Sequence, residues 1–396
     1  MAACGSSSSS GSGGSGGGAS SGSGGGGGKG SILIGLADDL SGPIAPYGKA
    51  DQAAWLAAIK VTNDAGGING RMLKLSSVDT QAAPDKDVAA VKRLAGNGAV
   101  VISGFTTSND CAAAQSANRT KVVLDCGTAA PKQLIPVNSD VFVRNPLELQ
   151  EMKPMNDMLK QQLGTVHYAL LPANLAGELS WASYLKTLAE QTGGTVSQQI
   201  LPITGSQAAQ IAATLNAKPN VVVLETSPQP LTNVVKGLRQ GGYTGPIINL
   251  TADYATAQAL ADPNLYVYND TAFAIPGATP EVDKFVAALS AQGVSGADKL
   301  NETNLVNGYL NAMVTIAALK SCNGCEGDDL SKAMEKQNLE LDGLTPKGGF
   351  GYSASSHIPN TYMEAYVYDP ATKGQKLAYH LALTAPGDIP ESALSE

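Results

Sequence analysis

Short apolar runs alternate with longer amphipathic runs after residue 30, and this alternation restricts the fold more than any other feature of the chain. Apolar runs of strand length between helical runs indicate βαβ units, which build parallel sheets with right-handed crossovers. We therefore expect an α/β, doubly wound fold. The strands expected first are 32–36, 72–79, 100–104 and 121–125, and the helices are 49–65, 85–97 and 112–118.

The same pattern starts again near residue 148, which predicts a second unit of similar size. Its expected strands are 165–171, 195–201, 220–224 and 246–250, and its helices are 148–163, 178–192, 206–217 and 231–241. Further helices are expected at 280–292, 301–320 and 330–337, and an antiparallel hairpin at 361–368 and 376–383. About 366 of the 396 residues follow the first thirty, which is more than one hydrophobic core usually serves, so we expect two lobes.

The first thirty residues differ in composition from the rest. Residues 5–30 are Gly and Ser apart from one Ala and one Lys, and such a segment has too little apolar surface to offset the entropy of ordering it. We expect a disordered tether with a root-mean-square span of roughly 25–30 Å. Cys4 follows Ala2-Ala3, which resembles the end of a bacterial lipobox and predicts a lipid anchor, with a stray thiol as the alternative. The charged and apolar parts of a signal peptide do not precede Cys4, so we expect a misassigned or trimmed start.

Charge and hydropathy argue against two classes of partner. The net charge is −8, and no cluster of Lys and Arg offers the positive charge that phosphate backbones require, so no nucleic-acid partner is expected. No apolar run approaches the roughly 18–20 residues of a membrane-spanning helix, so a lipid anchor is the only membrane attachment that we expect.

The four cysteines after the tether suit an oxidising compartment. The pairings that we favour are Cys111 with Cys126 and Cys322 with Cys325. A zinc site at Cys322-Asn-Gly-Cys325 would need two more ligands nearby, and none is there. A thioredoxin-type motif would follow a strand, whereas this one follows a helical run.

Enzymatic motifs are missing from the sequence. The chain has three histidines, His167, His357 and His380, without metal-ligand spacing, and we interpret His167 as a buried strand residue. No nucleophile elbow, phosphate-binding loop or zinc-protease motif occurs. Asp38-Asp39 could be proposed as a catalytic pair, but adjacent residues at a strand end point to opposite faces. We expect neither an enzyme nor a cofactor.

The stretch from Ile32 to Ile68 identifies a family. A buried strand leads into Ser41-Gly42-Pro43, then Tyr47, and a helix that ends at Gly66-Gly67. This arrangement resembles the opening of type I periplasmic solute-binding proteins, in particular the branched-chain amino-acid-binding group that serves ABC importers. The resemblance implies two Rossmann-like lobes joined by a three-segment hinge. Lobe one would comprise 31–147 plus 273–355, and lobe two 148–272 plus 356–396.

The resemblance also implies where a ligand would bind in lobe one. Ligands of open α/β sheets bind at the carboxyl ends of the strands, where Ser41 and Tyr47 follow the first strand. Gly104 to Asp110 resembles the family's carboxylate-binding loop, in which hydroxyls and free amides at a helix start bind an anion. Ser108 matches the family's serine by position, and Thr107 precedes it as a second hydroxyl. Helix capping by these residues is the alternative interpretation. Gly127, Thr128 and Ala129 align with a segment that contacts a bound amino acid, but Ala129 stands where the family has a threonine, and Thr128 falls one place early.

Lobe two departs from the family at its ligand positions. Ala176 replaces an aromatic residue that covers the ligand, and Ser227 stands where a second tyrosine is common. Thr251 aligns with the acidic residue that pairs with an α-ammonium group, and Asp253 would serve only if the loop is shifted. Tyr254, Trp181 and Tyr309 are candidate replacements for the lost aromatic cover.

These observations together predict an extracytoplasmic, membrane-anchored lipoprotein that captures a small carboxylate-bearing molecule and delivers it to an ABC permease. The ligand would be a branched-chain amino acid or a related organic acid or amide, and the protein would be a monomer. The alternatives are a ligand-sensing regulator of the same fold and, less favoured, a doubly wound enzyme.

Overall fold

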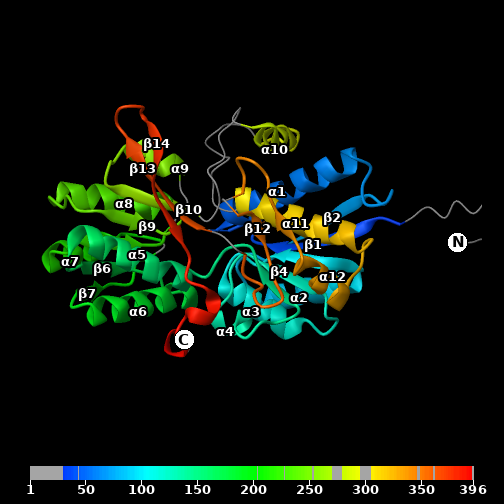
Figure 1. Cartoon of the computed structure of the whole chain (residues 1–396), viewed down its shortest axis with the longest axis horizontal. Coiled ribbons are helices and arrows are strands. Elements are labelled where there is room, and N and C mark those ends of the chain that lie inside the picture. The colour runs from blue at the N-terminus through cyan, green and yellow to red at the C-terminus, as the bar shows by residue number, and fades with distance from the viewer. Residues whose placement is uncertain are drawn as a thin grey trace, which may run out of the picture.

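Two β-sheets, each covered by helices on both faces, form the two lobes of the computed structural model (Figure 1). The structure describes residues 30–42, 44–202, 204–226, 228–251, 254–269, 279–294, 305–345, 348–359 and 362–394. The strand order is β2-β1-β3-β4-β5 in the first sheet and β14-β13-β10-β9-β8-β6-β7 in the second. The α/β, two-lobed prediction is confirmed.

The first lobe contains a fully parallel sheet whose strands alternate with helices. Its strands are β1 (Ile32–Asp38), β2 (Leu73–Asp79), β3 (Ala99–Gly104), β4 (Val123–Cys126) and β5 (Val141–Val143). The helices between them are α1 (Ala45–Asp64), α2 (Pro84–Gly96), α3 (Ser108–Ala117) and α4 (Pro131–Leu134).

The second lobe is built on parallel strands with an antiparallel hairpin at one edge. Its strands are β6 (His167–Leu171), β7 (Thr195–Gln198), β8 (Val221–Leu224), β9 (Ile247–Asn249), β10 (Leu265–Asn269), β13 (Tyr362–Asp369) and β14 (Gly374–Ala382). Its helices are α5 (Glu148–Leu163), α6 (Ala176–Gln191), α7 (Ala208–Ala217), α8 (Pro228–Gln240) and α9 (Tyr254–Leu260).

Three helices that come late in the sequence return to the first lobe. They are α10 (Pro280–Ser290), α11 (Leu305–Ser321) and α12 (Gly327–Met334). Both α10 and α11 pack against α1, and α12 contacts α11 and β4. The short strands β11 (Asn338–Leu339) and β12 (Phe350–Gly351) follow them, before β13 joins the second sheet. The residue-level lobe boundaries stay a prediction.

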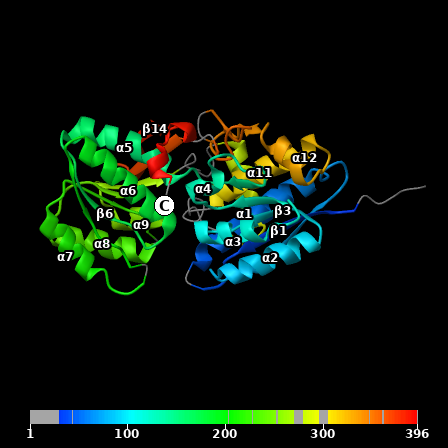
Figure 2. The ribbon, with the colours of Figure 1, turned by 90° about the horizontal axis from the view of Figure 1, so that it is seen from below.

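The lobes meet where helices from each side approach. Figure 2 shows α3 and α4 of the first lobe opposite α6 and α9 of the second, and α3 contacts α6. One buried apolar cluster includes residues of α2, α3, α5 and α6, so apolar contact continues from one lobe into the other.

Several local predictions are corrected by the structure. Helix α1 begins at Ala45 rather than 49, with a proline in its first turn, so Tyr47 lies inside the helix rather than before it. His167 is partly buried at the start of β6, where its Nδ1 lies 2.7 Å from Thr195 Oγ1, instead of in the core. Strands β5 and β10 were not predicted.

Both predicted disulfides are confirmed, since Cys111 bonds to Cys126 and Cys322 to Cys325. Within the described ranges, no helix combines the length and the apolar character needed to cross a membrane. Cys4 and all but the last residue of the Gly/Ser tether lie outside these ranges.

Candidate ligand-binding site

The carboxyl ends of β1, β3 and β4 bring most predicted lobe-one residues to one edge of the first sheet. These strands are parallel neighbours, so the loops that follow them lie side by side. Hydrogen bonds join the three loops: Thr106 Oγ1 donates to Asp38 Oδ1 (2.6 Å), and Thr128 Oγ1 donates to the Thr106 carbonyl (3.2 Å). The predicted site residues therefore belong to one connected structure.

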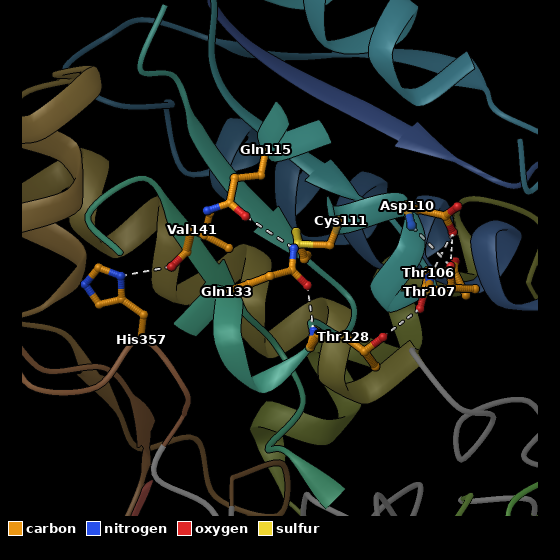
Figure 3. The surroundings of a disulfide bond; sticks show 11 residues. Thr106, Thr107, Asp110, Cys111, Gln115, Thr128, Gln133, Val141 and His357 are labelled. Atoms are coloured by element: carbon orange, nitrogen blue, oxygen red, sulfur yellow. Dashed lines mark hydrogen bonds between the residues drawn. A yellow bond between two sulfur atoms is a disulfide. The ribbon is translucent and has the colours of Figure 1, made fainter. Parts of the chain in front are cut away.

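The loop after β3 leads into the N-terminus of α3, where Thr107 is the N-cap (Figure 3). Its hydroxyl accepts from the Asp110 amide (3.3 Å), while Asp110 Oδ2 accepts from the Thr107 amide (3.0 Å) and hydroxyl (2.7 Å). The Thr107 hydroxyl is thus used for capping. Ser108, the first residue of α3, is buried, and Asn109 beside it is exposed, so this helix start offers backbone donors at the edge of the sheet.

The loop after β4 is fixed to the loop after β3 by hydrogen bonds and a disulfide. The Gly127 amide donates to the carbonyls of Gly104 (2.8 Å) and Phe105 (3.3 Å). The Cys111–Cys126 disulfide joins α3 to the end of β4 (Figure 3), so the loops after β3 and β4 are linked covalently. Thr128 is half-buried and Ala129 is buried.

The loop after β1 is fixed by Asp79, at the end of β2. Asp79 Oδ1 accepts from the amides of Leu40 and Ser41, and Oδ2 accepts from the Ser41 hydroxyl at 2.6 Å. Desolvation would raise the pKa of Asp79, but these hydrogen bonds, with one from Gln81, outweigh it and lower the pKa. Ser41 is therefore a loop-fixing residue, while Tyr47 is half-buried in the first turn of α1.

Buried carboxyl groups gather behind these loops. Desolvation, together with the neighbouring Asp110 carboxylate, raises the pKa of Asp87 to about 8. Desolvation also raises the pKa of Asp39, whose Oδ1 accepts from the Thr80 hydroxyl at 2.9 Å. Asp38 and Asp39 have different partners and do not act as one pair. Burial therefore favours the protonated forms of Asp87 and Asp39 at this edge.

A buried arginine lies at the centre of this edge. Arg144 follows β5, is fully buried, and its Nη1 lies 2.9 Å from Asp51 Oδ2 of α1. Asp38 and Asp125 are also fully buried, and burial raises the pKa of each to about 7 despite the opposing effect of Arg144. Sequence reasoning missed Arg144 and Asp51. A charged residue directly after the apolar run 141–143 was the available signal.

In lobe two, the loops after β6, β8 and β9 lie at the corresponding sheet edge. Asn249 ties two of them, because its Oδ1 accepts from the Thr226 amide (3.2 Å) and its Nδ2 donates to the Thr251 carbonyl (2.9 Å). Thr251 is half-buried, and Ala176 is the first residue of α6. Ser227, Asp253 and the side chain of Tyr254 lie outside what the structure describes.

Two proposed aromatic covers are wrong. Trp181 is fully buried in α6, and its indole Nε1 donates to Glu225 Oε2 at 2.9 Å. Tyr309 is buried in the core of the first lobe against Phe285, with ring centroids 4.5 Å apart. Both side chains are therefore packed inside their lobes rather than placed to cover a ligand.

An acidic group also follows β8 in lobe two. Glu225, directly after this strand, is half-buried beside Trp181. Glu178, in the first turn of α6, is buried and accepts a hydrogen bond from the Ala173 amide. Desolvation raises the pKa of Glu178 to about 8, the Ala173 amide opposes that rise, and the nearby Glu148 adds to it.

Among the described residues, no group of three or more His, Cys, Asp or Glu side chains could hold a metal ion.

Two doubly wound lobes that meet at the contact of α3 with α6 define the class of the protein as a two-lobed α/β fold. The profile of the periplasmic binding protein family matches residues 31–375. The chain belongs to the periplasmic binding protein family, as its opening sequence indicated.

Comparisons with individual proteins agree with this assignment. The chain is 34% identical to the Leu/Ile/Val-binding protein homolog 1 of Brucella abortus over 77 residues, which cover 19% of this chain and 21% of that protein. The match thus spans about a fifth of the curated relative.

Solved structures show the same fold over nearly the whole chain. A solute-binding protein of an ABC transporter from Rhodopseudomonas palustris, in complex with p-hydroxybenzoic acid, has a TM-score of 0.75 at 16% identity, covering 92% of this chain and 99% of its own. The branched-chain amino acid transporter substrate-binding protein LivJ of Streptococcus pneumoniae, in complex with isoleucine, has a TM-score of 0.72 at 19% identity, covering 90% and 100%.

Proposed function

We propose that this protein is the extracytoplasmic solute-binding component of an ABC importer, which captures a small molecule between its lobes and delivers it to a membrane permease. The names of similar proteins support this proposal: one is a solute-binding protein of an ABC transporter, one is a substrate-binding protein of a branched-chain amino acid transporter, and one is a Leu/Ile/Val-binding protein homolog. The proposed lobes are 31–147 plus 273–355 and 148–272 plus 356–396. Closure about the segments between them would enclose the ligand.

The observation that carries the proposal is the connected set of loops at the carboxyl ends of β1, β3 and β4. Thr106 and Thr128 tie these loops together, and the N-terminus of α3 adds backbone donors, with α6 of lobe two in contact with α3. A carboxylate seated at this helix start would accept hydrogen bonds from amides with positive character. Ser108, Gly127, Thr128 and Ala129 are the proposed contacts, with Ser41, Tyr47 and Thr107 around them.

The composition of lobe two supports a ligand that differs from an ordinary branched-chain amino acid. Ala176 and Ser227 take the places of aromatic residues, and Thr251 takes the place of an acidic one. A small organic acid or amide fits this set of residues, as does an amino acid whose ammonium group is held by Asp253. The p-hydroxybenzoic acid bound by the structural neighbour belongs to the first class.

The anchoring of the protein is also part of the proposal. Cys4 would carry lipid, and residues 5–30 would let a monomeric binding domain reorient above the membrane. Two disulfides in the described chain support an oxidising compartment and disfavour a cytoplasmic regulator. Labelling cells with a fatty-acid analogue would test this anchor: wild type should incorporate the label, and Cys4→Ser should not.

A ligand panel on the full chain tests the function. It would contain isoleucine, leucine, valine, 4-hydroxybenzoate, benzoate and their amides, scored by thermal shift and then by calorimetry. A ligand at about 100 times its Kd stabilises the folded state by roughly 2.7 kcal/mol. No binding across the panel would contradict the proposal.

Matched serine variants on α3 test the site. Ser108→Ala removes a buried hydroxyl at the helix start, and Ser116→Ala removes an exposed hydroxyl on the same helix. We expect the first to weaken binding of the panel's best ligand about tenfold, equivalent to about 1.4 kcal/mol, and the second to leave it unchanged. Equal affinities for both variants would place the site elsewhere.

A further inference from the structure

Arg144 stands between the proposed ligand loops and the chain segment that enters lobe two. Its backbone amide donates to the Cys126 carbonyl at 3.0 Å, immediately before the Gly127 loop. An ideal Cβ at Gly127 would lie 2.7 Å from Arg144 Nη2, so the guanidinium lies directly against this loop. Three residues after Arg144, Leu147 is the N-cap of α5 in lobe two.

The guanidinium is fully buried among more carboxyl groups than it can neutralise. Nη1 bonds to Asp51 Oδ2, whereas Nε and Nη2 have no hydrogen-bond partner within the described ranges. Asp38, at the end of β1, and Asp125, in β4, are fully buried nearby. Burial raises the pKa of both carboxyls to about 7, and Arg144 lowers it. One buried guanidinium therefore lies among three buried carboxyl groups and forms an ion pair with Asp51.

This cluster connects to the ligand loops and to the first crossing between the lobes. Asp38 Oδ1 accepts from the Thr106 hydroxyl at 2.6 Å, and the Thr106 carbonyl accepts from Thr128. On the other side, Asn145 follows Arg144, and its Oδ1 accepts from Asn307 Nδ2 of α11 at 2.7 Å. A substitution of Arg144 would therefore alter the positions of both the ligand loops and the first crossing between the lobes.

We propose that Arg144 is a positioning residue for ligand binding: it holds the loops after β3 and β4 and the first interlobe crossing in one arrangement, and it couples binding to proton uptake by Asp38 and Asp125. This inference rests on the proposed function. An anionic group brought to the Thr128 loop repels ionised carboxylates behind it, and in a poorly solvated interior this repulsion favours their protonated forms. The ligand carboxylate therefore binds together with a fraction of a proton.

Three other titratable groups of the described residues face this cluster, and each has a reason not to be the main site of proton uptake. Asp51, on α1, is fully buried, and desolvation raises its pKa, but Arg144 Nη1 lies 2.9 Å from its Oδ2 and favours its ionised form. Tyr352 donates to the Val143 carbonyl (3.0 Å), and burial raises its pKa well above the usual range, so it keeps its proton near neutral pH. Asp39 has separate partners in Thr80 and Ala82. Asp38 and Asp125 are left as the exchanging groups.

Calorimetry with the full chain tests the proposal, with isoleucine and 4-hydroxybenzoate as probes at pH 7. Titrations in phosphate and in Tris, whose ionisation enthalpies differ, report the protons taken up per ligand bound. We expect wild type to take up roughly half a proton, and Asp125→Asn, which keeps the shape of the side chain, to take up clearly less. Equal uptake by wild type and Asp125→Asn would overturn the proposal, as would zero uptake by a wild type that binds.

Arginine variants test the positioning role. Arg144→Met is expected to weaken binding by tenfold or more and Arg144→Lys to recover part of that loss, because the lysine keeps the buried charge. Arg239→Met is the matched control, since Arg239 forms a partly buried ion pair with Asp262 in lobe two, and it should leave affinity and proton uptake unchanged. A folded Arg144→Met with wild-type affinity and uptake would overturn the inference.

Two further outcomes separate this inference from the function on which it rests. If Arg144→Met does not fold, the comparison of proton uptake between wild type and Asp125→Asn tests the inference on its own. A wild type that binds neither probe nor any member of the panel overturns the proposed function and this inference with it, whereas binding without proton uptake overturns only the inference.

Discussion

Replacing Glu178 by Gln should change how the stability of the protein depends on pH. Glu178 is buried in the first turn of α6, and desolvation, with a further contribution from Glu148, raises its pKa from 4.5 to about 8. Between these two values the folded state binds more protons than the unfolded state, so stability falls as the pH rises. Each pKa unit corresponds to 1.36 kcal/mol, so the loss between pH 5 and 8 is at most about 4 kcal/mol.

Glutamine keeps the shape of the side chain and an oxygen that can accept from the Ala173 amide, but it does not ionise. The free energy of unfolding of Glu178→Gln minus that of wild type should therefore increase from pH 5 to pH 8 by about 2–4 kcal/mol. Urea denaturation of both proteins at pH 5, 6.5 and 8, with the disulfides intact, measures this difference.

Glu190→Gln is the control for this experiment, because Glu190 lies on the same helix and is exposed. Its stability difference from wild type should not vary with pH. A Glu178→Gln difference that stays constant within about 0.5 kcal/mol from pH 5 to 8 would refute the argument that burial holds Glu178 in its protonated form.

Three other substitutions test the packing around the site. Gly127→Ala places a Cβ against the buried Arg144 guanidinium and should cost about 1–3 kcal/mol in chemical denaturation, whereas Gly96→Ala, which meets no atom within 4 Å, should not destabilise. Replacing Cys111 and Cys126 together by alanine should lower the free energy of unfolding by about 3 kcal/mol, because the disulfide closes a loop of 15 residues. Replacing Cys322 and Cys325, which are separated by 3 residues, should lower it by less. The reverse order would contradict the chain-entropy argument. Trp181→Phe removes the indole donor to Glu225 and should cost about 1–3 kcal/mol; no loss in thermal denaturation would mean that this hydrogen bond contributes little.

The order of strands and helices followed from the sequence because its cause is local. A buried parallel strand is a short apolar run, and a helix shows its periodic apolar face, so α5 was predicted at its observed bounds, Glu148–Leu163. The start of α1 was missed because the proline in its first turn suggested a loop. Strand β5 has three residues, Val141–Val143, too few to show a period.

The location of the candidate site could be predicted from the sequence, but its side-chain contacts could not. The ends of parallel strands meet at one edge, so the loops holding Ser108 and Thr128 could be grouped from the sequence. The pairing of Arg144 with Asp51 joins residues 93 positions apart, and no local pattern connects them. Trp181 and Tyr309 were misassigned because the buried side of each helix depends on neighbouring elements that are distant in sequence, such as Phe285 of α10 against Tyr309.

The cost of the buried carboxyls has a consequence for ligand binding. Asp38 and Asp125 lie at the strand ends, where desolvation raises the pKa of each from 3.8 to about 7, so the folded state loses stability as the pH rises between these two values. Neutral residues at these positions would avoid this loss of stability, so the carboxyls are expected to have a functional role in the loops that they contact. If binding a carboxylate favours their protonated forms, affinity for an anionic ligand must fall as the pH rises through 7, because the proton taken up becomes scarcer. The steepness of that fall equals the protons taken up per ligand, so a pH series of binding constants and the two-buffer calorimetry must give the same number.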